Sequence, residues 1–148
     1  MKNINVVHLN VVKEKSFRYE INQIKSPNDA INVLNQFIND YCNNDRENFI
    51  IMCLDTKNKI NALNIVSIGT LNSSSVHPRE VFKLAILSNS YSIIICHNHP
   101  SGDPAPSKED VEITNRLVKC SNILGVNILD HIIIGDFQNY SFKEHGRM

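Results

Sequence analysis

Two histidines and an aspartate lie close together in the segment ICHNHPSGDPAPSKED, which runs from residue 95 to residue 110. His97 and His99 are two residues apart, and Asp110 follows a loop that contains three prolines. Two imidazoles and one carboxylate form a ligand set that suits zinc and leaves one coordination position open. A water molecule at such a position becomes a nucleophile near neutral pH. The segment therefore predicts metal-assisted hydrolysis.

A strand can position the two histidines. The apolar run 92–96 is too short for a helix before the proline at position 100 and predicts a buried strand. Residues i and i+2 of a strand share a face, so His97 and His99 should project the same way, about 6.5 Å apart at their Cα atoms. Asn98 should point away. A histidine pair of this kind, taken alone, more often marks two polar residues at a strand end.

A helix can position the aspartate. Residues 107–124 predict a helix that begins with Ser107, buries Val111, Thr114, Leu117, Val118 and Ile123, and stops at Gly125. Ser107 and Asp110 resemble a capping box, which is their structural explanation. The two roles are compatible, because Asp110 lies one turn into the helix and can aim its carboxylate at the histidines. Prolines and Gly102 should hold the loop in a fixed bend.

The remaining elements predict one domain of α/β (α+β) class, with a mixed central sheet flanked by about three helices. We expect residues 1–25 to be an N-terminal hairpin extension and residues 26–148 to be the domain. The expected helices span residues 26 to about 41, 77 to about 90, and 107–124. The expected strands span residues 49–54, 60–69, 92–96, 128–134 and 139–142, with a weak hairpin formed by 6–12 and 17–21.

Composition narrows the classes of function. Fifteen basic and 15 acidic residues cancel among 148, which leaves no global field to hold nucleic acid or an anionic membrane. No apolar run is long enough to span a bilayer, and the N-terminus lacks a signal-peptide pattern. The four cysteines are widely spaced, and Cys53 and Cys96 should be buried thiols. This pattern predicts a cytoplasmic protein without disulfides or cysteine-bound zinc.

The spacing His97-x-His99, seven residues, Ser107-x-x-Asp110 resembles the JAMM motif of the JAB/MPN metalloprotease fold. The surrounding residues are more similar still to the RadC-like bacterial branch, in the blocks VHPREV at 76–81, HNHPSGDP at 97–104 and LDHIIIG at 129–135. The resemblance extends from about residue 26 to residue 142. It implies a single JAB/MPN-like (cytidine-deaminase-like) domain. RadC proteins usually carry a helix-hairpin-helix-like region before this domain, and the sequence shows no counterpart.

The resemblance also implies residue roles. His97, His99 and Asp110 would bind zinc, and Ser107 would donate a hydrogen bond to the developing oxyanion. An upstream glutamate would take the proton of the attacking water and pass it to the leaving amine.

Two glutamates compete for that role. Glu47 precedes the strand at residue 49, as the catalytic acid does in this fold, and we prefer it; otherwise it is a solvated loop residue. Glu80 could equally be an acid that stabilises a helix start. His131 could orient a metal ligand or could be a core histidine with satisfied hydrogen bonds.

These implications favour a zinc-dependent hydrolase that cleaves amide bonds, peptide or isopeptide, in a protein or peptide substrate. Two alternatives stay open: a non-catalytic MPN interaction module, and a factor associated with DNA repair or recombination. The neutral charge argues against nucleic acid as a partner. The letters His-Asn-His do not make an HNH nuclease, whose three residues are far apart in sequence. Exposed edge strands could pair in a homodimer.

Overall fold

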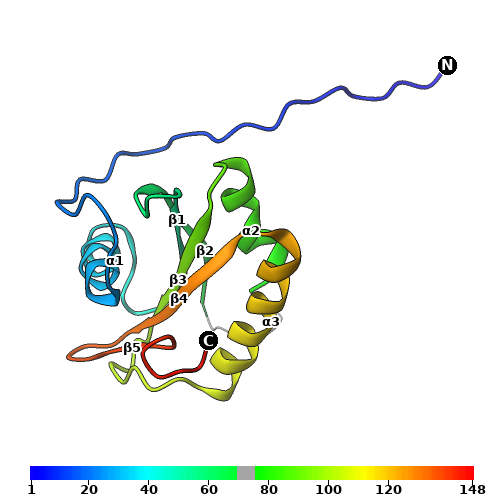
Figure 1. Ribbon diagram of the computed structural model, residues 1–148. Coiled ribbons are helices and arrows are strands. Elements are labelled where there is room, and N and C mark those ends of the chain that lie inside the picture. Colours follow the sequence, from blue (N-terminus) through cyan, green and yellow to red (C-terminus); the bar gives the residue numbers. More distant parts are fainter. Residues whose placement is uncertain (70–75) are drawn as a thin grey trace.

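A computed structural model describes residues 1–69 and 76–148, which form one five-stranded mixed sheet and three helices (Figure 1). The elements are α1 (Pro27–Tyr41), β1 (Asn48–Leu54), β2 (Ile60–Ile68), α2 (Pro78–Leu87), β3 (Ser92–Asn98), α3 (Lys108–Leu124), β4 (Asn127–Ile134) and β5 (Asn139–Ser141). The strand order is β2-β1-β3-β4-β5. β3 and β4 are parallel, whereas the other pairs are antiparallel. The predicted fold class and element order within the domain are confirmed.

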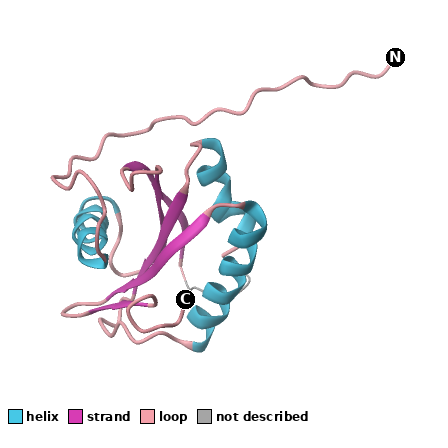
Figure 2. Cartoon of the chain, viewed as in Figure 1, coloured by secondary structure: helices cyan, strands magenta, loops and turns pink. Residues whose placement is uncertain are grey.

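The sheet is the middle of three layers. α1 covers one face, and α2 and α3 cover the other (Figure 2). β1 and β3 are buried along their whole length, and their side chains alternate between the two cores. Ile50 and Met52 face α1, whereas Phe49 and Ile51 face α2 and α3. His97 pairs with Phe49 and therefore lies on the face covered by α2 and α3.

Local capping fixes where the helices begin and end. Ser26 forms a capping box with Asp29 at the start of α1. The His77 ring accepts a hydrogen bond from the Arg79 N–H at the start of α2. That helix ends at Leu87, earlier than predicted, and Asn89 beyond it has a left-handed φ of 51°.

The buried face of α3 differs in part from the prediction. The buried residues are Asp110, Ile113, Thr114, Leu117 and Ser121, one stripe along the helix. A helix turns about 100° per residue, so Ile123 lies well off this stripe and is 85% exposed. Its predicted burial is therefore wrong.

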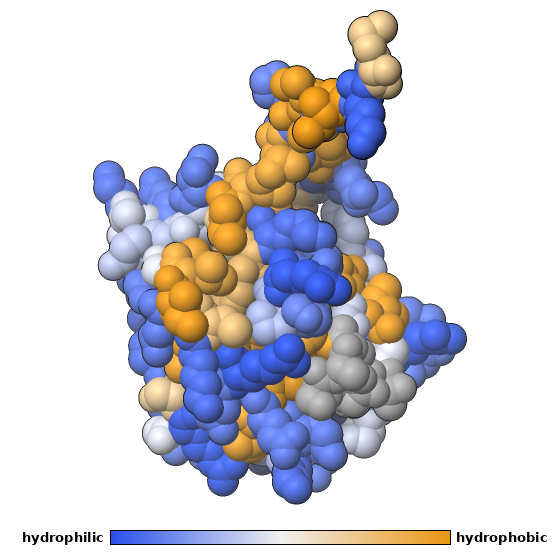
Figure 3. Space-filling model, turned by 90° about the vertical axis from the view of Figure 1, so that its right-hand side faces the viewer, coloured by the Kyte–Doolittle hydropathy of each residue, from blue (hydrophilic) through white to orange (hydrophobic). Residues whose placement is uncertain are grey.

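The predicted N-terminal hairpin is also wrong. Residues 1–25 contain no helix or strand, and most of this segment extends away from the body of the protein (Figures 1 and 3). Its large apolar side chains, Val6, Val7 and Leu9 among them, are exposed. An isolated two-stranded hairpin is at best marginally stable in water, and nothing in the described chain covers this one. Contact with the domain begins at Lys15, whose ammonium lies over the ring of Tyr41 in α1. The Ser16 carbonyl accepts a hydrogen bond from the Tyr41 hydroxyl, and the Phe17 ring packs against Phe37 and Tyr41.

The four cysteines are free thiols, and Cys53 and Cys96 are buried as predicted. Within the described residues, every helix is too short or too polar to cross a bilayer.

Candidate metal centre

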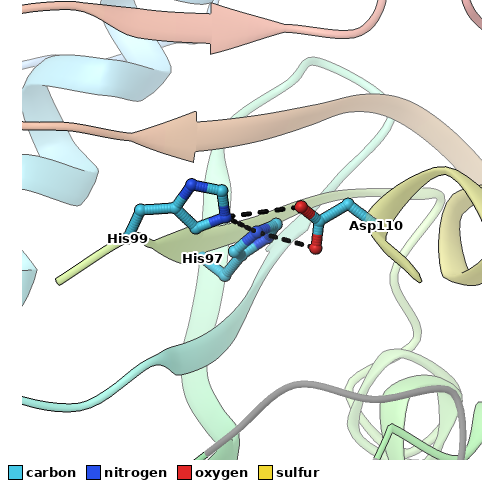
Figure 4. A group of neighbouring side chains, drawn as sticks. All are labelled: His97, His99 and Asp110. Carbon is cyan, nitrogen blue, oxygen red and sulfur yellow. Dashed lines mark hydrogen bonds and ion pairs between the residues drawn. The ribbon is translucent and has the colours of Figure 1, made fainter. Parts of the chain in front are cut away.

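β3 and α3 bring the three predicted ligands together. His97 is fully buried near the end of β3, His99 follows that strand, and Asp110 lies in the first turn of α3. Both rings and the carboxylate turn towards one point (Figure 4). His97 Nε2 is 3.2 Å from Asp110 Oδ1, and His99 Nε2 is 3.3 Å from Asp110 Oδ2. The two Nε2 atoms are 3.0 Å apart.

The hydrogen bonds of His99 leave its Nε2 atom free for a metal. His99 Nδ1 is 2.7 Å from the carbonyl oxygen of Asp103. A carbonyl oxygen only accepts, so Nδ1 carries the proton and the neutral ring presents the lone pair of Nε2 to the centre. Metal-binding histidines usually donate their second ring N–H to a fixed acceptor in this way.

The three groups fit a zinc ion. Zinc–ligand bonds of 2.0–2.1 Å in a tetrahedron place the ligand atoms about 3.3 Å apart. The two Nε2 atoms are 3.0 Å apart, and each is close to that distance from one oxygen of Asp110: His97 from Oδ1 at 3.2 Å and His99 from Oδ2 at 3.3 Å. One ligand atom from each of the three residues lies within 4.8 Å of the others. Nitrogen lone pairs and a carboxylate repel each other at such distances unless a cation lies between them. The donor set is therefore built for a proton or a metal cation.

The pKa values of the cluster reflect the same attraction for positive charge. Burial would raise the pKa of Asp110, but hydrogen bonds with His97 and His99 outweigh it and hold that pKa far below its usual range. The hydrogen bond with Asp110 raises the pKa of His99 against the opposing effect of burial. The carboxylate thus stays ionised and stabilises positive charge in the centre.

Ser107 caps α3 beside the centre. Its backbone N–H donates to Asp110 Oδ2 at 2.7 Å, and its Oγ accepts from the Asp110 N–H at 3.1 Å. This capping box fixes the direction of the carboxylate. Ser107 is exposed, and the hydroxyl proton is not used in the box. Its role towards an oxyanion stays a prediction.

Glu47 lies just before β1, and the strand register predicts the same face of the sheet for it as for the ligands. Phe49 pairs with His97, so continuing the antiparallel register by two residues brings Glu47 opposite His99. Residues 47 and 49 share a face, as do 97 and 99. The pKa of His99 is raised chiefly by Asp110 and, more weakly, by the charge of Glu47. Both observations bring the Glu47 carboxylate near the centre.

Asn98 holds the backbone around Glu47 from the other side of the strand. Its Oδ1 accepts from the Asn48 N–H at 2.8 Å, and its Nδ2 donates to the Arg46 carbonyl at 2.9 Å. These two contacts flank Glu47. The predicted direction of Asn98, away from the histidines, is confirmed, but its contacts with β1 could not be predicted.

The described contacts of the Glu80 side chain are with its own helix. Its carboxylate contacts Lys83 at 2.7 Å and Arg79 at 3.8 Å, both on its own helix. The hydrogen bond with Lys83 is the main reason why its pKa is lowered. The geometry therefore favours Glu47 over Glu80 as the general base, a role that stays a prediction.

His131 lies directly behind a ligand. It is fully buried in β4, and its Nε2 is 2.9 Å from His97 Nδ1. Its ring stacks on Phe142 with centroids 4.8 Å apart and meets Phe49 edge-on. Burial lowers its pKa well below the usual value, so the ring is neutral. Of its two predicted roles, contact with a metal ligand is the one that the geometry favours.

A second turn supports the loop between the ligands. The Gly102 N–H donates to the His99 carbonyl at 2.9 Å, and the Gly102 carbonyl accepts from the Asp136 N–H at 3.0 Å. Gly102 has a φ of 82°, which favours glycine. Gly135 must also be glycine, because a Cβ atom there would lie 2.5 Å from the Gly102 carbonyl oxygen. The turn between β4 and β5 thus fixes the loop that presents His99.

Several known proteins are similar in sequence to this chain. The family model described as RadC-like JAB domain matches residues 24–147. A UPF0758 protein of Caldanaerobacter subterraneus is 54% identical over 123 residues, which are 83% of this chain and 52% of that protein. A UPF0758 protein of Desulforamulus reducens is 49% identical over 123 residues, 83% of this chain and 53% of that protein.

A third relative, a UPF0758 protein of Clostridium botulinum, is 45% identical over 145 residues, 98% of this chain and 64% of that protein. The chain spans about half the length of the first two relatives and less than two thirds of the third. The match of the family model covers nearly the whole domain, including all three residues of the candidate metal centre. The chain therefore belongs to the RadC-like JAB domain family.

Proposed function

We propose that this chain is a zinc-dependent hydrolase of amide bonds, peptide or isopeptide. The observation that carries the proposal is the convergence of His97 Nε2, His99 Nε2 and the Asp110 carboxylate, with each nitrogen 3.2–3.3 Å from one carboxylate oxygen and 3.0 Å from the other nitrogen. Three protein ligands leave the fourth position open, which is the arrangement of a catalytic rather than a structural zinc site.

The residues around the centre have complementary roles in this proposal. Bound zinc would supply a Lewis acid for the amide carbonyl and for a water molecule. The Glu47 carboxylate accepts a proton from the attacking water and returns it to the amine nitrogen as the carbon–nitrogen bond breaks. The Ser107 hydroxyl donates a hydrogen bond to the carbonyl oxygen as negative charge develops on it.

We further propose that the substrate is a protein or peptide and that the protein works in the cytoplasm. The ligand side chains are 0%, 12% and 4% exposed, so the centre opens to the surface at His99. An opening at the surface suits an extended chain better than a small molecule that must be enclosed. Four free cysteines are consistent with a reducing compartment.

Metal analysis of purified protein tests the ligand assignment. We expect about one zinc per wild-type chain and at least a 100-fold loss of zinc affinity in His97→Ala and Asp110→Ala, because each removes a direct ligand. Glu80→Ala is the matched control and should keep its zinc. Stoichiometric zinc in both ligand variants would contradict the proposal.

A further inference from the structure

A chain of hydrogen bonds runs behind the metal centre, from the backbone of α3 to the ring of His97. Thr114 Oγ1 is 2.6 Å from the Asp110 carbonyl oxygen. His131 Nδ1 is 2.6 Å from the same Oγ1, and His131 Nε2 is 2.9 Å from His97 Nδ1. The chain thus begins at the backbone of one proposed ligand, Asp110, and ends at the ring of another.

The direction of every hydrogen bond in this series follows from its first acceptor, the Asp110 carbonyl oxygen. A carbonyl oxygen only accepts, so the Thr114 hydroxyl must donate its single proton to Asp110. That hydroxyl can then only accept from His131, whose Nδ1 carries the proton. A neutral imidazole has one N–H, so His131 Nε2 presents a lone pair and accepts from the Nδ1–H of His97. His97 Nε2 is thereby left without a proton, as a metal ligand requires.

The surroundings keep His131 neutral and in place. The ring is fully buried between Phe142 and Phe49, and both of its nitrogens have partners. A protonated His131 would aim an N–H at His97 Nδ1 and would drive the proton of His97 to the metal-facing Nε2. Apolar packing around the ring disfavours that charged state.

We propose that Thr114 and His131 are positioning residues that fix the tautomer of His97 and so keep its Nε2 atom open for the metal. This inference rests on the proposed metal-binding function. The two histidine ligands reach the same end by different routes. His99 donates directly to the Asp103 carbonyl, whereas His97 is connected to the Asp110 carbonyl through two side chains.

A matched pair of variants separates this role from packing. Thr114→Val keeps the branched shape but removes the hydroxyl, so the direction of the hydrogen bonds from His131 to His97 is no longer fixed. Thr114→Ser keeps the hydroxyl and removes one methyl group. We expect Thr114→Val to bind zinc at least 10-fold more weakly than wild type in a chelator competition, the range for residues behind a ligand. We expect Thr114→Ser to stay within about 3-fold of wild type, since the acceptor and donor remain.

Nitrogen NMR of the histidine rings tests the tautomers without any metal or activity. In metal-free wild-type protein at pH 8, we expect a proton on Nδ1 and none on Nε2 of His131, and a proton on Nδ1 of His97. In Thr114→Val this preference should be lost or reversed, whereas Thr114→Ser should keep it.

Two results would overturn the proposal: a proton on His131 Nε2 in the wild-type protein, or equal zinc affinity in the valine and serine variants. If Thr114→Val fails to fold, the wild-type ring spectrum still decides. Wild-type protein that has the expected tautomers but binds no zinc would reject the proposed function and leave the hydrogen-bond assignment intact.

Discussion

At the scale of single residues, the centre depends on where each proton lies. The Nε2 atoms of His97 and His99 are 3.0 Å apart, so neither can be protonated when both bind one metal ion. For His99, the Asp103 carbonyl oxygen accepts a hydrogen bond from Nδ1. The proton of the neutral ring therefore lies on Nδ1, and Nε2 carries none. In the proposed reaction the general base is therefore a carboxylate outside the ligand set, and continuing the register of β1 and β3 by two residues brings Glu47 opposite His99.

Glu47→Gln should abolish turnover while zinc stays bound. The amide is nearly the same size but cannot accept the proton of water, so we expect a loss of at least 100-fold in kcat on any amide substrate that the wild type cleaves. Zinc content should remain at one per chain. Glu80→Gln is the matched control and should keep both activity and zinc, because its carboxylate contacts Arg79 and Lys83. Loss of activity in the Glu80 variant alone would reverse the assignment.

Zinc affinity should fall in acid because the metal must displace a proton from His99. The hydrogen bond with Asp110 raises the pKa of His99 above its ordinary value of 6.5. At a pH below its raised pKa the His99 ring is protonated in the metal-free protein, so zinc binding releases that proton. We expect affinity to fall by roughly 10-fold for each pH unit below 6.5 from this proton alone. Calorimetric zinc titrations at pH 5.5 and 6.5 measure the slope, and a flat profile would contradict it.

At the scale of secondary-structure elements, the sequence predicts the ligands but not the contacts that support them. Spacing alone brings His97 and His99 to one face of a strand and Asp110 to a helix start. The contact of His131 with Thr114 requires that α3 pack over β4 in one particular position, which periodicity does not specify. The contacts of Asn98 likewise depend on the β1–β3 register. The hairpin prediction was wrong because a pattern of strand-forming residues does not show whether the rest of the protein has a surface against which the hairpin can pack.

Gly135→Ala should weaken the loop that carries His99 more than it weakens the fold. An added Cβ atom would lie 2.5 Å from the Gly102 carbonyl oxygen and 2.7 Å from that of Gln138, so the backbone must shift. We expect about 1–3 kcal/mol less stability and a clear loss of zinc affinity. Gly146→Ala is a control for adding a methyl group in open space, although its φ of 64° makes some strain unavoidable. Unchanged zinc binding in Gly135→Ala would show that the two turns are not coupled.

At the scale of the whole molecule, the described chain has an exposed N-terminal segment and a packed domain, and burial separates the two although their composition does not. Residues 1–15 are exposed throughout, although many of them are apolar. Ile24, by contrast, is 5% exposed and belongs to the core under α1, and its backbone N–H donates to the Asn58 carbonyl. The predicted division at residues 25 and 26 therefore needs a direct test, because part of the proposed extension packs against the domain.

Two truncations make that test. Removal of residues 1–15 should change the free energy of unfolding by less than about 1 kcal/mol and leave zinc stoichiometry intact, because these residues are exposed and the contact of the Lys15 ammonium with the Tyr41 ring contributes no more than that. Removal of residues 1–25 also deletes Phe17, Tyr19 and Ile24, whose side chains pack against α1 and its core. At about 1.5–3 kcal/mol for each fully buried large side chain, we expect a loss of roughly 2–5 kcal/mol. Denaturant unfolding of both forms measures the difference. Equal stabilities would support a domain that starts at residue 26, whereas a large loss from the shorter truncation would show that the extended segment packs against the domain in solution.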